Sequence, residues 1–319
     1  MNASLPVETI NITATTPLSP SLLSGRRSPA LLPSLPLGPC LTTWTPDHLI
    51  ASSLSSKLVS VHSSSSPRLN FISKNFTYER ISFAQLVANC CSSSNTFWYL
   101  RSLGDTSHSR SDLATHFPSL AAELDIPPLF SPETFFSSVF RISSPSLELW
   151  THYDTLDNVL IQVRGSKRVV LFPPRDADKL YLVGDKTSVV DWEADDLLEK
   201  YPKLREVTKY EVILQPGDVL FIPALWFHSI TAIDFSISVN LFWKNLDGEQ
   251  FYDKKDTYGN RDLIPAQLAF KTFEKATAQL KQLPPDYEDF YLRRMIINIQ
   301  KRLDTLKSEE DNQNSDDRE

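Results

Sequence analysis

Short runs of β-branched and aromatic residues, separated by Pro, Gly, Asp and Ser, dominate the middle of the chain, a pattern typical of strands. The clearest runs lie at 139–150, 158–163, 167–172, 209–223 and 236–243. Only RGS separates the second run from the third, so NVLIQV and KRVVLF predict a hairpin. No long helical pattern interrupts these runs. They therefore predict an antiparallel barrel or double sheet rather than alternating β and α units.

The N-terminal third has a mixed pattern. Residues 1–35 are rich in Ser, Thr and Pro without periodicity, so we expect a loose leader there. Ordered elements are expected from residue 36, with a short helix after Thr45-Pro46, a helix over 81–91 and a strand over 96–104. We assign residues 36–250 to one β domain with N-terminal flanking elements.

The pattern becomes helical after Tyr252. Two amphipathic stretches are separated by Pro284-Pro285, so 251–307 is expected to be a helical region. In the second stretch, apolar residues follow spacings of 4, 3, 4 and 3, at Leu292, Ile296, Ile299, Leu303 and Leu306. This heptad seam fits a helix that packs on its own domain and a helix that binds a second copy equally well.

Charge and cysteine content narrow the class of protein. Six acidic residues and one arginine in the tail 308–319 account for −5 of the net charge of −7, which leaves −2 for the rest. Three cysteines, two of them adjacent, are too few for a disulfide framework and indicate a reducing compartment. No secretory signal and no membrane-spanning run is present, so we expect a soluble intracellular protein, cytoplasmic or nuclear.

The stretch LWTHYDTLDN places His152 and Asp154 two residues apart in a strand-like segment. Side chains at i and i+2 of a strand project from the same face, so these two groups are expected to lie together. One imidazole and one carboxylate supply two of the three ligands of a 2-His-1-carboxylate iron(II) site. A His-x-Asp pair is common by chance, and an exposed loop pair is the plain alternative.

The third ligand is expected from QPGDVLFIPALWFHSI, in which His228 follows an apolar strand. A histidine among Trp226, Phe227 and Ile230 must have its nitrogens satisfied if it is buried. A core histidine with ordinary partners is the alternative, but the upstream pair lacks one ligand. The remaining histidines stand in polar or Ser-rich surroundings and are expected at the surface: His48, His62, His108 and His116.

An iron(II) site of this class takes a co-substrate that chelates the metal and carries a distal carboxylate, which requires a fixed cation inside the barrel. Lys167 begins the strand expected to run beside the ligand strand. It competes with Arg164 and Arg168, and an ordinary lysine at a hairpin tip is the alternative.

Several long blocks resemble the JmjC class of Fe(II)/2-oxoglutarate oxygenases, above all WTHYDTLDNVLIQVRGSKRVVLFPPRDADKLYL and GDVLFIPALWFH. With FISKNF, YLRSLG, FFSSVFRISSP, VNLFWK and YDKKDTYGN, the chain resembles more narrowly the tRNA wybutosine-synthesising hydroxylases over about 37–306. The resemblance implies a mainly β fold, a double-stranded β-helix (cupin/JmjC jelly roll), with a C-terminal helical region that forms a homodimer.

The resemblance also implies residue roles. His152, Asp154 and His228 match the iron ligands, and Tyr99, Asn158 and Lys167 match positions that hold 2-oxoglutarate. Tyr99 is otherwise an ordinary strand tyrosine, and Asn158 otherwise a turn cap. Asn240 is a weaker candidate for a polar group facing the pocket. A tRNA substrate requires nearby cations. The candidates, each otherwise a routine surface residue, are Arg101, Arg141, Arg175, Lys254 and Lys255.

The implied reaction uses Fe(II), 2-oxoglutarate and O2 to hydroxylate the side chain of a wybutosine precursor, 7-(3-amino-3-carboxypropyl)wyosine, beside the anticodon of tRNA(Phe). A JmjC protein hydroxylase or histone lysine demethylase is the alternative with the same chemistry. A non-catalytic metal-binding cupin is the alternative from another class, and Lys167 and Tyr99 argue against it because a scaffold needs no carboxylate anchor.

Overall fold

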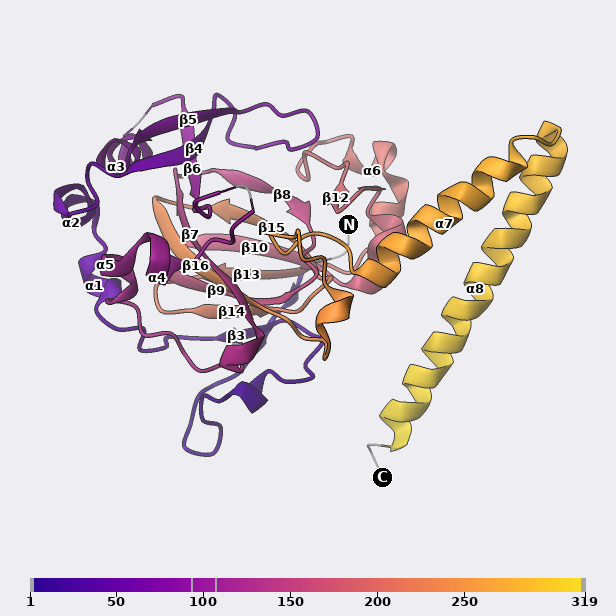
Figure 1. Ribbon diagram of the computed structural model, residues 1–319, viewed down its shortest axis with the longest axis horizontal. Helices are drawn as coiled ribbons and strands as arrows, with labels where there is room; N and C mark the ends of the chain where they lie inside the picture. The colour runs from indigo at the N-terminus through magenta and orange to yellow at the C-terminus, as the bar shows by residue number, and fades with distance from the viewer. Residues whose placement is uncertain (1–2, 93, 107, 317–319) are drawn as a thin grey trace. The chain divides into compact units, whose positions relative to one another are not determined.

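The structure is a computed structural model that describes residues 3–92, 94–106 and 108–316, with side chains up to residue 309. The chain divides into two units: a barrel domain formed by 1–249 and 253–261, and a helical unit formed by 250–252 and 262–319 (Figure 1). The predicted start of the helical region at residue 251 lies within this transition. The two units are described separately below.

Two sheets of antiparallel strands build the barrel domain, with parallel pairing only of β1 with β13 and β2 with β3 among the described strands. The nine-stranded sheet has the order β2 (Glu8–Thr9), β3 (Ala30–Leu32), β14 (Val219–Ile222), β9 (Asp157–Arg164), β16 (Ser236–Trp243), β7 (Phe135–Ser143), β6 (Phe97–Arg101), β4 (Leu58–Ser64) and β5 (Thr77–Ser82). The seven-stranded sheet has the order β1 (Leu5–Pro6), β13 (Tyr210–Leu214), β10 (Lys167–Phe172), β15 (Phe227–Ala232), β8 (Glu148–His152), β12 (Lys186–Thr187) and β11 (Leu182–Val183). The predicted fold class, mainly β with C-terminal helices, is confirmed.

The predicted hairpin between β9 and β10 is wrong. β9 pairs with β14 and β16, whereas β10 pairs with β13 and β15, so the RGS turn carries the chain from one sheet to the other. Gly165 makes this corner possible, because its φ is +65° and a Cβ there would lie 2.1 Å from the carbonyl oxygen of Phe235. Strand periodicity alone does not distinguish such a corner from a hairpin.

The predicted loose leader is also wrong for the described residues of 1–35. β1 extends the seven-stranded sheet beside β13, and β3 pairs with β14 in the other sheet. Leu23 and Leu32 are buried in the main hydrophobic core. The leader is ordered because its few apolar residues complete two sheet edges, a long-range effect that local composition does not record.

Short helices accompany the sheets: α1 (Cys40–Thr43), α2 (Pro46–Ala51), α3 (Phe83–Cys91), α4 (Leu113–His116), α5 (Pro118–Ala121) and α6 (Leu197–Lys200). The first five supply apolar residues to a core on the outer face of the nine-stranded sheet. Trp44, Phe83 and Phe140 are fully buried there, and the rings of Trp44 and Phe140 meet edge to face at 5.5 Å. The predicted helices after Thr45-Pro46 and over 81–91 are confirmed.

Strand alternation gives the barrel a polar interior. On β16, Ile237, Val239 and Leu241 belong to the outer core. The alternate residues Ser238 and Asn240 are buried on the opposite, inner face. Part of the interior is closed by a second apolar cluster, which includes Leu160, Val169, Leu171, Leu220 and Ile230. Buried polar groups need partners, so the remaining polar part of the interior is where a binding site is expected.

The helical unit contains α7 (Ile264–Leu280) and α8 (Pro285–Asp316). Pro284 and Pro285 separate them as predicted, and Pro285 starts α8, where its missing N–H costs no hydrogen bond. α8 continues to Asp316, so most of the segment predicted as a tail after residue 307 is helical. Four of the five seam residues, Ile296, Ile299, Leu303 and Leu306, are exposed. Among the described helices, none combines the length and apolar character needed to cross a bilayer.

Candidate metal centre and cavity

Three side chains from two distant segments of the sequence converge at one end of the barrel interior. His152 is the last residue of β8, Asp154 follows two residues later, and His228 lies on β15 directly opposite His152 in the strand register. One potential ligand atom from each of the three lies within 4.8 Å of the others. Asp154 lies just beyond the end of β8, not within the sheet as the i, i+2 spacing predicted. Its side chain nevertheless lies beside that of His152.

Both imidazoles are oriented by backbone carbonyls. Nδ1 of His152 lies 2.9 Å from the carbonyl oxygen of Trp150, and Nδ1 of His228 lies 3.0 Å from that of Trp226. A carbonyl only accepts, so each Nδ1 carries a proton and each Nε2 keeps its lone pair. This tautomer is the one required of an Nε2 metal ligand.

Burial adjusts the protonation of all three groups. Desolvation lowers the pKa of His228 to about 4, and it lowers that of His152, assisted by His228. Desolvation raises the pKa of Asp154 to about 7, against the opposing effect of Arg141 and Arg101. Neutral imidazoles are ready to bind a metal, whereas the carboxylate gains from a cation. The donor set therefore fits a divalent metal with open coordination positions.

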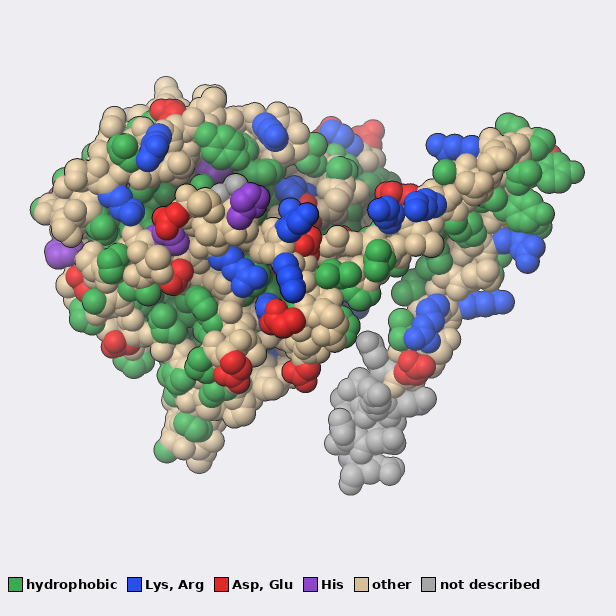
Figure 2. Space-filling view, viewed as in Figure 1, with side chains coloured by type: hydrophobic (Ala, Val, Ile, Leu, Met, Phe, Trp, Pro, Cys, Tyr) green, Lys and Arg blue, Asp and Glu red, His purple; other side chains and the backbone are tan. Residues whose placement is uncertain are grey.

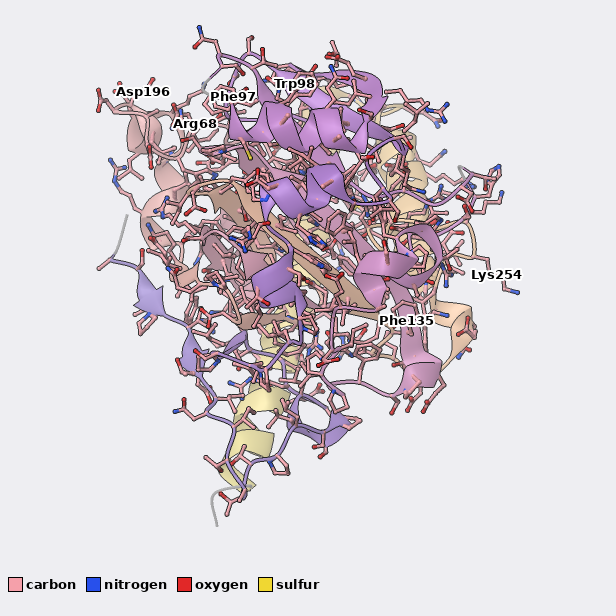
Figure 3. The ribbon with its side chains drawn as sticks, turned by 90° about the vertical axis from the view of Figure 1, so that its left-hand side faces the viewer. Arg68, Phe97, Trp98, Phe135, Asp196 and Lys254 are labelled. Carbon is pink, nitrogen blue, oxygen red and sulfur yellow. The ribbon has the colours of Figure 1, made fainter. Side chains whose placement is uncertain are left out.

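A cavity of about 370 Å³ opens beside the three ligands. On strand β6, Trp98 packs against the outer core that includes α3, whereas Phe97 (both labelled in Figure 3), Tyr99 and Arg101 lie on the opposite, inner face. The lining is Ser60, His62, Phe71, Tyr78, Tyr99, Arg101, Leu103, Arg141, Leu149, Trp150, His152, Asp154, Asp185, Lys186, Phe242, Tyr258 and Asn260. Aromatic rings and cations thus share one cavity with two of the candidate metal ligands.

A chain of hydrogen bonds connects the polar residues of the interior. Arg141 donates from Nη1 to the hydroxyl of Tyr99 and from Nε to Oδ1 of Asn240, the latter over 2.8 Å. Asn240 donates to Oδ1 of Asn158 over 3.3 Å, and Asn158 donates to the carbonyl oxygen of Ile222 over 3.3 Å. Tyr99, Asn158 and Asn240 therefore lie in one network on the inner faces of four strands. Whether they bind 2-oxoglutarate stays a prediction.

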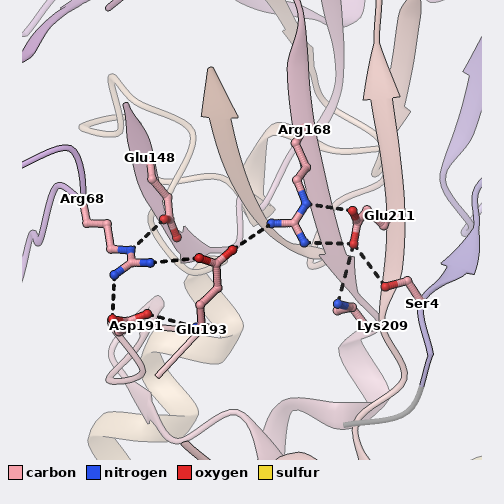
Figure 4. Close-up of polar contacts among 8 residues, drawn as sticks. All are labelled: Ser4, Arg68, Glu148, Arg168, Asp191, Glu193, Lys209 and Glu211. Carbon is pink, nitrogen blue, oxygen red and sulfur yellow. Dashed lines mark hydrogen bonds and ion pairs between the residues drawn. The ribbon is translucent and has the colours of Figure 1, made fainter. Parts of the chain in front are cut away.

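Lys167 is the basic residue of its segment that points inward. It is 2 % exposed, and its Nζ donates to Ser238 Oγ. Its competitors point elsewhere: Arg164 donates to the carbonyl oxygen of Trp44, and Arg168 pairs with Glu211 in an ion network on the outside of the sheet (Figure 4). Lys167 forms no ion pair with any described residue, and burial, assisted by Arg141, lowers its pKa to about 7.

The other predicted surface histidines divide into two groups. His48 and His108 are exposed as predicted, whereas His62 and His116 are only partly exposed. His62 lines the cavity, its ring lies 5.5 Å from that of Tyr99, and desolvation lowers its pKa to about 4. The Ser-rich sequence around His62 suggested an exposed turn, but His62 and the first of those serines belong to the end of strand β4. Arg101 and Arg141, predicted as tRNA contacts, line the same cavity.

Comparisons with known proteins agree with this architecture. The sequence profile described as a cupin-like domain matches residues 23–249. The chain is 48% identical over 286 residues to tRNA wybutosine-synthesizing protein 5 of Danio rerio, covering 87% of each chain. It is 46% identical over 293 residues to the protein of that name from Homo sapiens, covering 89% of this chain and 92% of that one. It is 35% identical to tRNA wybutosine-synthesizing protein 4 of Gibberella zeae over 84% of this chain and 26% of that protein.

Proposed function

The chain belongs to the family of cupin-like domains, and on this premise we propose that it is an Fe(II)- and 2-oxoglutarate-dependent oxygenase that hydroxylates the side chain of a wybutosine precursor in tRNA(Phe). The observation that carries the proposal is the joint occurrence of a His-Asp-His cluster and a buried lysine without an acidic partner among the described residues. A metal-binding scaffold needs the first feature but has no use for the second.

The residues fit both Fe(II) and 2-oxoglutarate. His152, Asp154 and His228 would hold Fe(II), since their ligand atoms already converge and both Nε2 atoms are unprotonated. Lys167 would pair with the distal carboxylate of 2-oxoglutarate, and Tyr99 and Asn158 would donate or accept hydrogen bonds at the same ligand. A buried ammonium costs free energy unless an anion neutralises it, so a dicarboxylate satisfies a charge that the protein leaves uncompensated.

When bound, these groups supply the oxidation: O2 is consumed as 2-oxoglutarate loses CO2 to become succinate, and one oxygen atom enters a C–H bond of the substrate. The contribution of the chain is positional. Trp150 and Trp226 carbonyls fix the two imidazoles, Asn240 holds Arg141 against Tyr99, and the apolar cluster around Leu160 closes the interior to water.

The cavity suits a flat heteroaromatic base. The rings of Phe71 and Trp150 lie 4.2 Å apart at its wall, and rings are the surfaces on which unpaired bases stack. Among the described residues, Nδ1 of His62 and Nε1 of Trp150 are buried without a hydrogen-bond partner, and both side chains line the cavity. These groups favour a base over an extended peptide, whose backbone needs paired donors and acceptors.

A tRNA also needs cations outside the cavity. Arg175, Lys254 and Lys255 are exposed, and Lys254 extends outward from the domain (Figure 3). Figure 2 shows Lys and Arg side chains gathered near the middle of the viewed face of the barrel domain. Contacts with phosphates supply affinity without sequence reading, so these residues would orient the tRNA while the cavity selects the base.

We propose further that the protein is a homodimer through its C-terminal helices. Ile296, Ile299 and Leu303 are 64%, 50% and 54% exposed along one heptad seam. Exposed apolar side chains at this spacing are typical of a helix that packs against another helix.

The test offers the purified protein, with iron, ascorbate and 2-oxoglutarate, either tRNA from cells that lack it or histone peptides. We expect the tRNA nucleoside to gain one oxygen atom with stoichiometric succinate, and the peptides to remain unchanged. Modification of the peptides instead of the tRNA would establish the alternative protein hydroxylase or demethylase. Absence of succinate with both substrates would leave the metal-binding scaffold.

A further inference from the structure

Arg101 holds an unusual position between two cavities. It lines the 370 Å³ cavity beside the metal ligands and an adjoining cavity of about 530 Å³. Its guanidinium carbon lies 4.6 Å from the ring centroid of Tyr258. Among the described residues it forms no ion pair, and burial, with repulsion from Arg141, lowers its pKa to about 10, so it stays charged at neutral pH.

The charges around the cavity do not balance. Arg101, Arg141 and Lys186 line it and Lys167 lies deeper in the barrel, whereas the lining acids are Asp154 and Asp185. With Lys167 included, four basic side chains stand against two acidic ones. An Fe(II) ion and doubly charged 2-oxoglutarate cancel one another, so two positive charges remain after both are bound. Uncompensated charge in a secluded cavity is costly, and a substrate that brings an anion relieves it.

The acids near Arg101 already have partners. Asp185 pairs with Lys186 and accepts a hydrogen bond from Asn260. Asp256 accepts from the backbone N–H groups of Tyr258, Gly259 and Arg261. Asp256 therefore organises the turn that carries Tyr258, on whose ring Arg101 stacks, rather than neutralising the charge of Arg101.

The turn that carries Tyr258 is hydrogen-bonded to the residue that follows Asp154, one of the candidate metal ligands. Thr155, the residue after Asp154, donates from its backbone N–H to the carbonyl oxygen of Gly259 and from its hydroxyl to that of Arg261, each over 3.0 Å. Gly259 has a φ of +78°, and a Cβ there would lie 2.7 Å from Leu156. The positive φ favours glycine here, and the turn packs against the side chain of Leu156, which places Tyr258 beside the candidate metal site.

Arg141, the other lining arginine, is engaged differently. Its Nε and Nη1 donate to Asn240 and Tyr99, and it influences the pKa of Lys167, His228 and Asp154. It thus belongs to the inner end of the cavity. Arg101 stacks on the ring of Tyr258, and its edge N–H groups form no ion pair with any described residue, so they can bind a planar oxyanion.

We propose that Arg101, held on the ring of Tyr258, binds the carboxylate of the amino acid side chain on the target base and thereby makes the enzyme select the free acid. The inference rests on the proposed function and names its specificity-determining residue. A guanidinium binds a carboxylate through two parallel hydrogen bonds, which anchors the side chain at one end and presents its carbons to the metal.

The experiment compares two tRNAs that carry the same modified base, one with the side-chain carboxylate free and one with it methylated. Affinity is measured by fluorescence anisotropy without O2, and turnover by nucleoside mass. We expect the unaltered protein to bind and convert the free acid about 10- to 100-fold better than the ester, the range expected for a charge-assisted contact. Equal affinity and equal turnover of the two tRNAs would overturn the inference while leaving the proposed function intact.

Variants identify the residue. Arg101→Met retains the stem but not the charge and is expected to lose the preference for the free acid, while Arg101→Lys retains part of it. Arg80→Met, at an exposed arginine of the adjoining cavity, is the matched control and should keep the full preference. An equal weakening of both tRNAs by Arg101→Met would indicate a backbone phosphate contact and overturn the assignment.

Folding is checked by succinate release without tRNA. If Arg101→Met fails that check, the proposed selection of the free acid is still tested by Tyr258→Leu and by the comparison of acid with ester on the unaltered protein. A lack of turnover of the free-acid tRNA by unaltered protein that releases succinate would overturn the proposed function and this inference together.

Discussion

His152 and His228 face each other across neighbouring strands, with their ring centroids 4.5 Å apart. Each ring donates from Nδ1 to the carbonyl oxygen two residues upstream, that of Trp150 within β8 and that of Trp226 just before β15. The sheet register thus sets their separation, and the backbone of each strand sets the tautomer. A third group, Asp154, needs only to follow the end of β8 to complete a metal site.

Replacing a ligand should abolish metal binding. We expect His152→Ala and Asp154→Ala to weaken Co(II) binding, followed by its visible absorption, by at least about 100-fold and to eliminate succinate release. His48→Ala, at an exposed histidine outside the cavity, should change neither. Unaltered Co(II) spectra in both ligand variants would show that the metal binds elsewhere.

The buried ammonium of Lys167 should make co-substrate binding depend on pH. Its pKa is lowered to about 7, and a carboxylate needs the protonated form. With saturating metal, we expect 2-oxoglutarate affinity to fall about tenfold between about pH 7 and about pH 8.5, measured by calorimetry. In Lys167→Met the affinity should be low at every pH, whereas Arg168→Met should behave as the unaltered protein.

The same shift predicts the sign of a stability change. In the unfolded chain Lys167 keeps its proton up to its ordinary pKa of 10.5, whereas in the folded, unliganded protein its pKa is about 7. The unfolded state binds more protons between these values, so this group makes stability rise with pH across that window. Denaturant unfolding of Lys167→Met should lack this rise, and an identical slope in both proteins would refute the buried position.

Asn240 links Asn158 to Arg141 through two hydrogen bonds. Asn240→Leu removes the acceptor of Arg141 Nε and the donor to Oδ1 of buried Asn158, so we expect the free energy of unfolding to fall by about 2–4 kcal/mol. Urea denaturation measures this change. Asn89→Leu, at a half-buried position on α3 outside the cavity, is the control and should cost less. A similar loss in the two variants would indicate that the network contributes no special stability.

Residues 1–35 should be required for folding. Their removal deletes β1, β2 and β3, uncovers Val219 and Phe221 on β14, and removes Leu23 and Leu32 from the core. Each large apolar side chain contributes about 1.5–3 kcal/mol, so we expect the shortened protein to aggregate or to melt far below the full chain. Removal of 310–319 should leave the melting of the barrel domain unchanged. A soluble, fully active protein lacking 1–35 would restore the loose-leader interpretation.

The proposed dimer is tested on the seam of α8. Ile296→Glu with Leu303→Glu places two charges among exposed apolar positions and should shift the mass measured by light scattering from dimer to monomer. Lys301→Glu, on the same helix but off the seam, should leave the mass unchanged. A monomeric mass for the unaltered protein at all concentrations would refute the dimer.

The sequence by itself determined the features that depend on local periodicity and residue chemistry. Alternating apolar runs predicted the strands, Pro284-Pro285 predicted the break between the helices, and the spacing of His152 and Asp154 predicted that these two side chains lie together. These succeeded because side-chain direction in a strand or helix follows directly from position in the chain.

Only the tertiary structure decided which segments meet. It turned the predicted RGS hairpin into a corner between sheets, drew 1–35 into both sheets, and moved His62 and Arg101 from an expected surface into the cavity. Strand pairing and cavity lining arise from contacts between distant residues. Their free energy depends on burial and on partners that no local window of sequence contains.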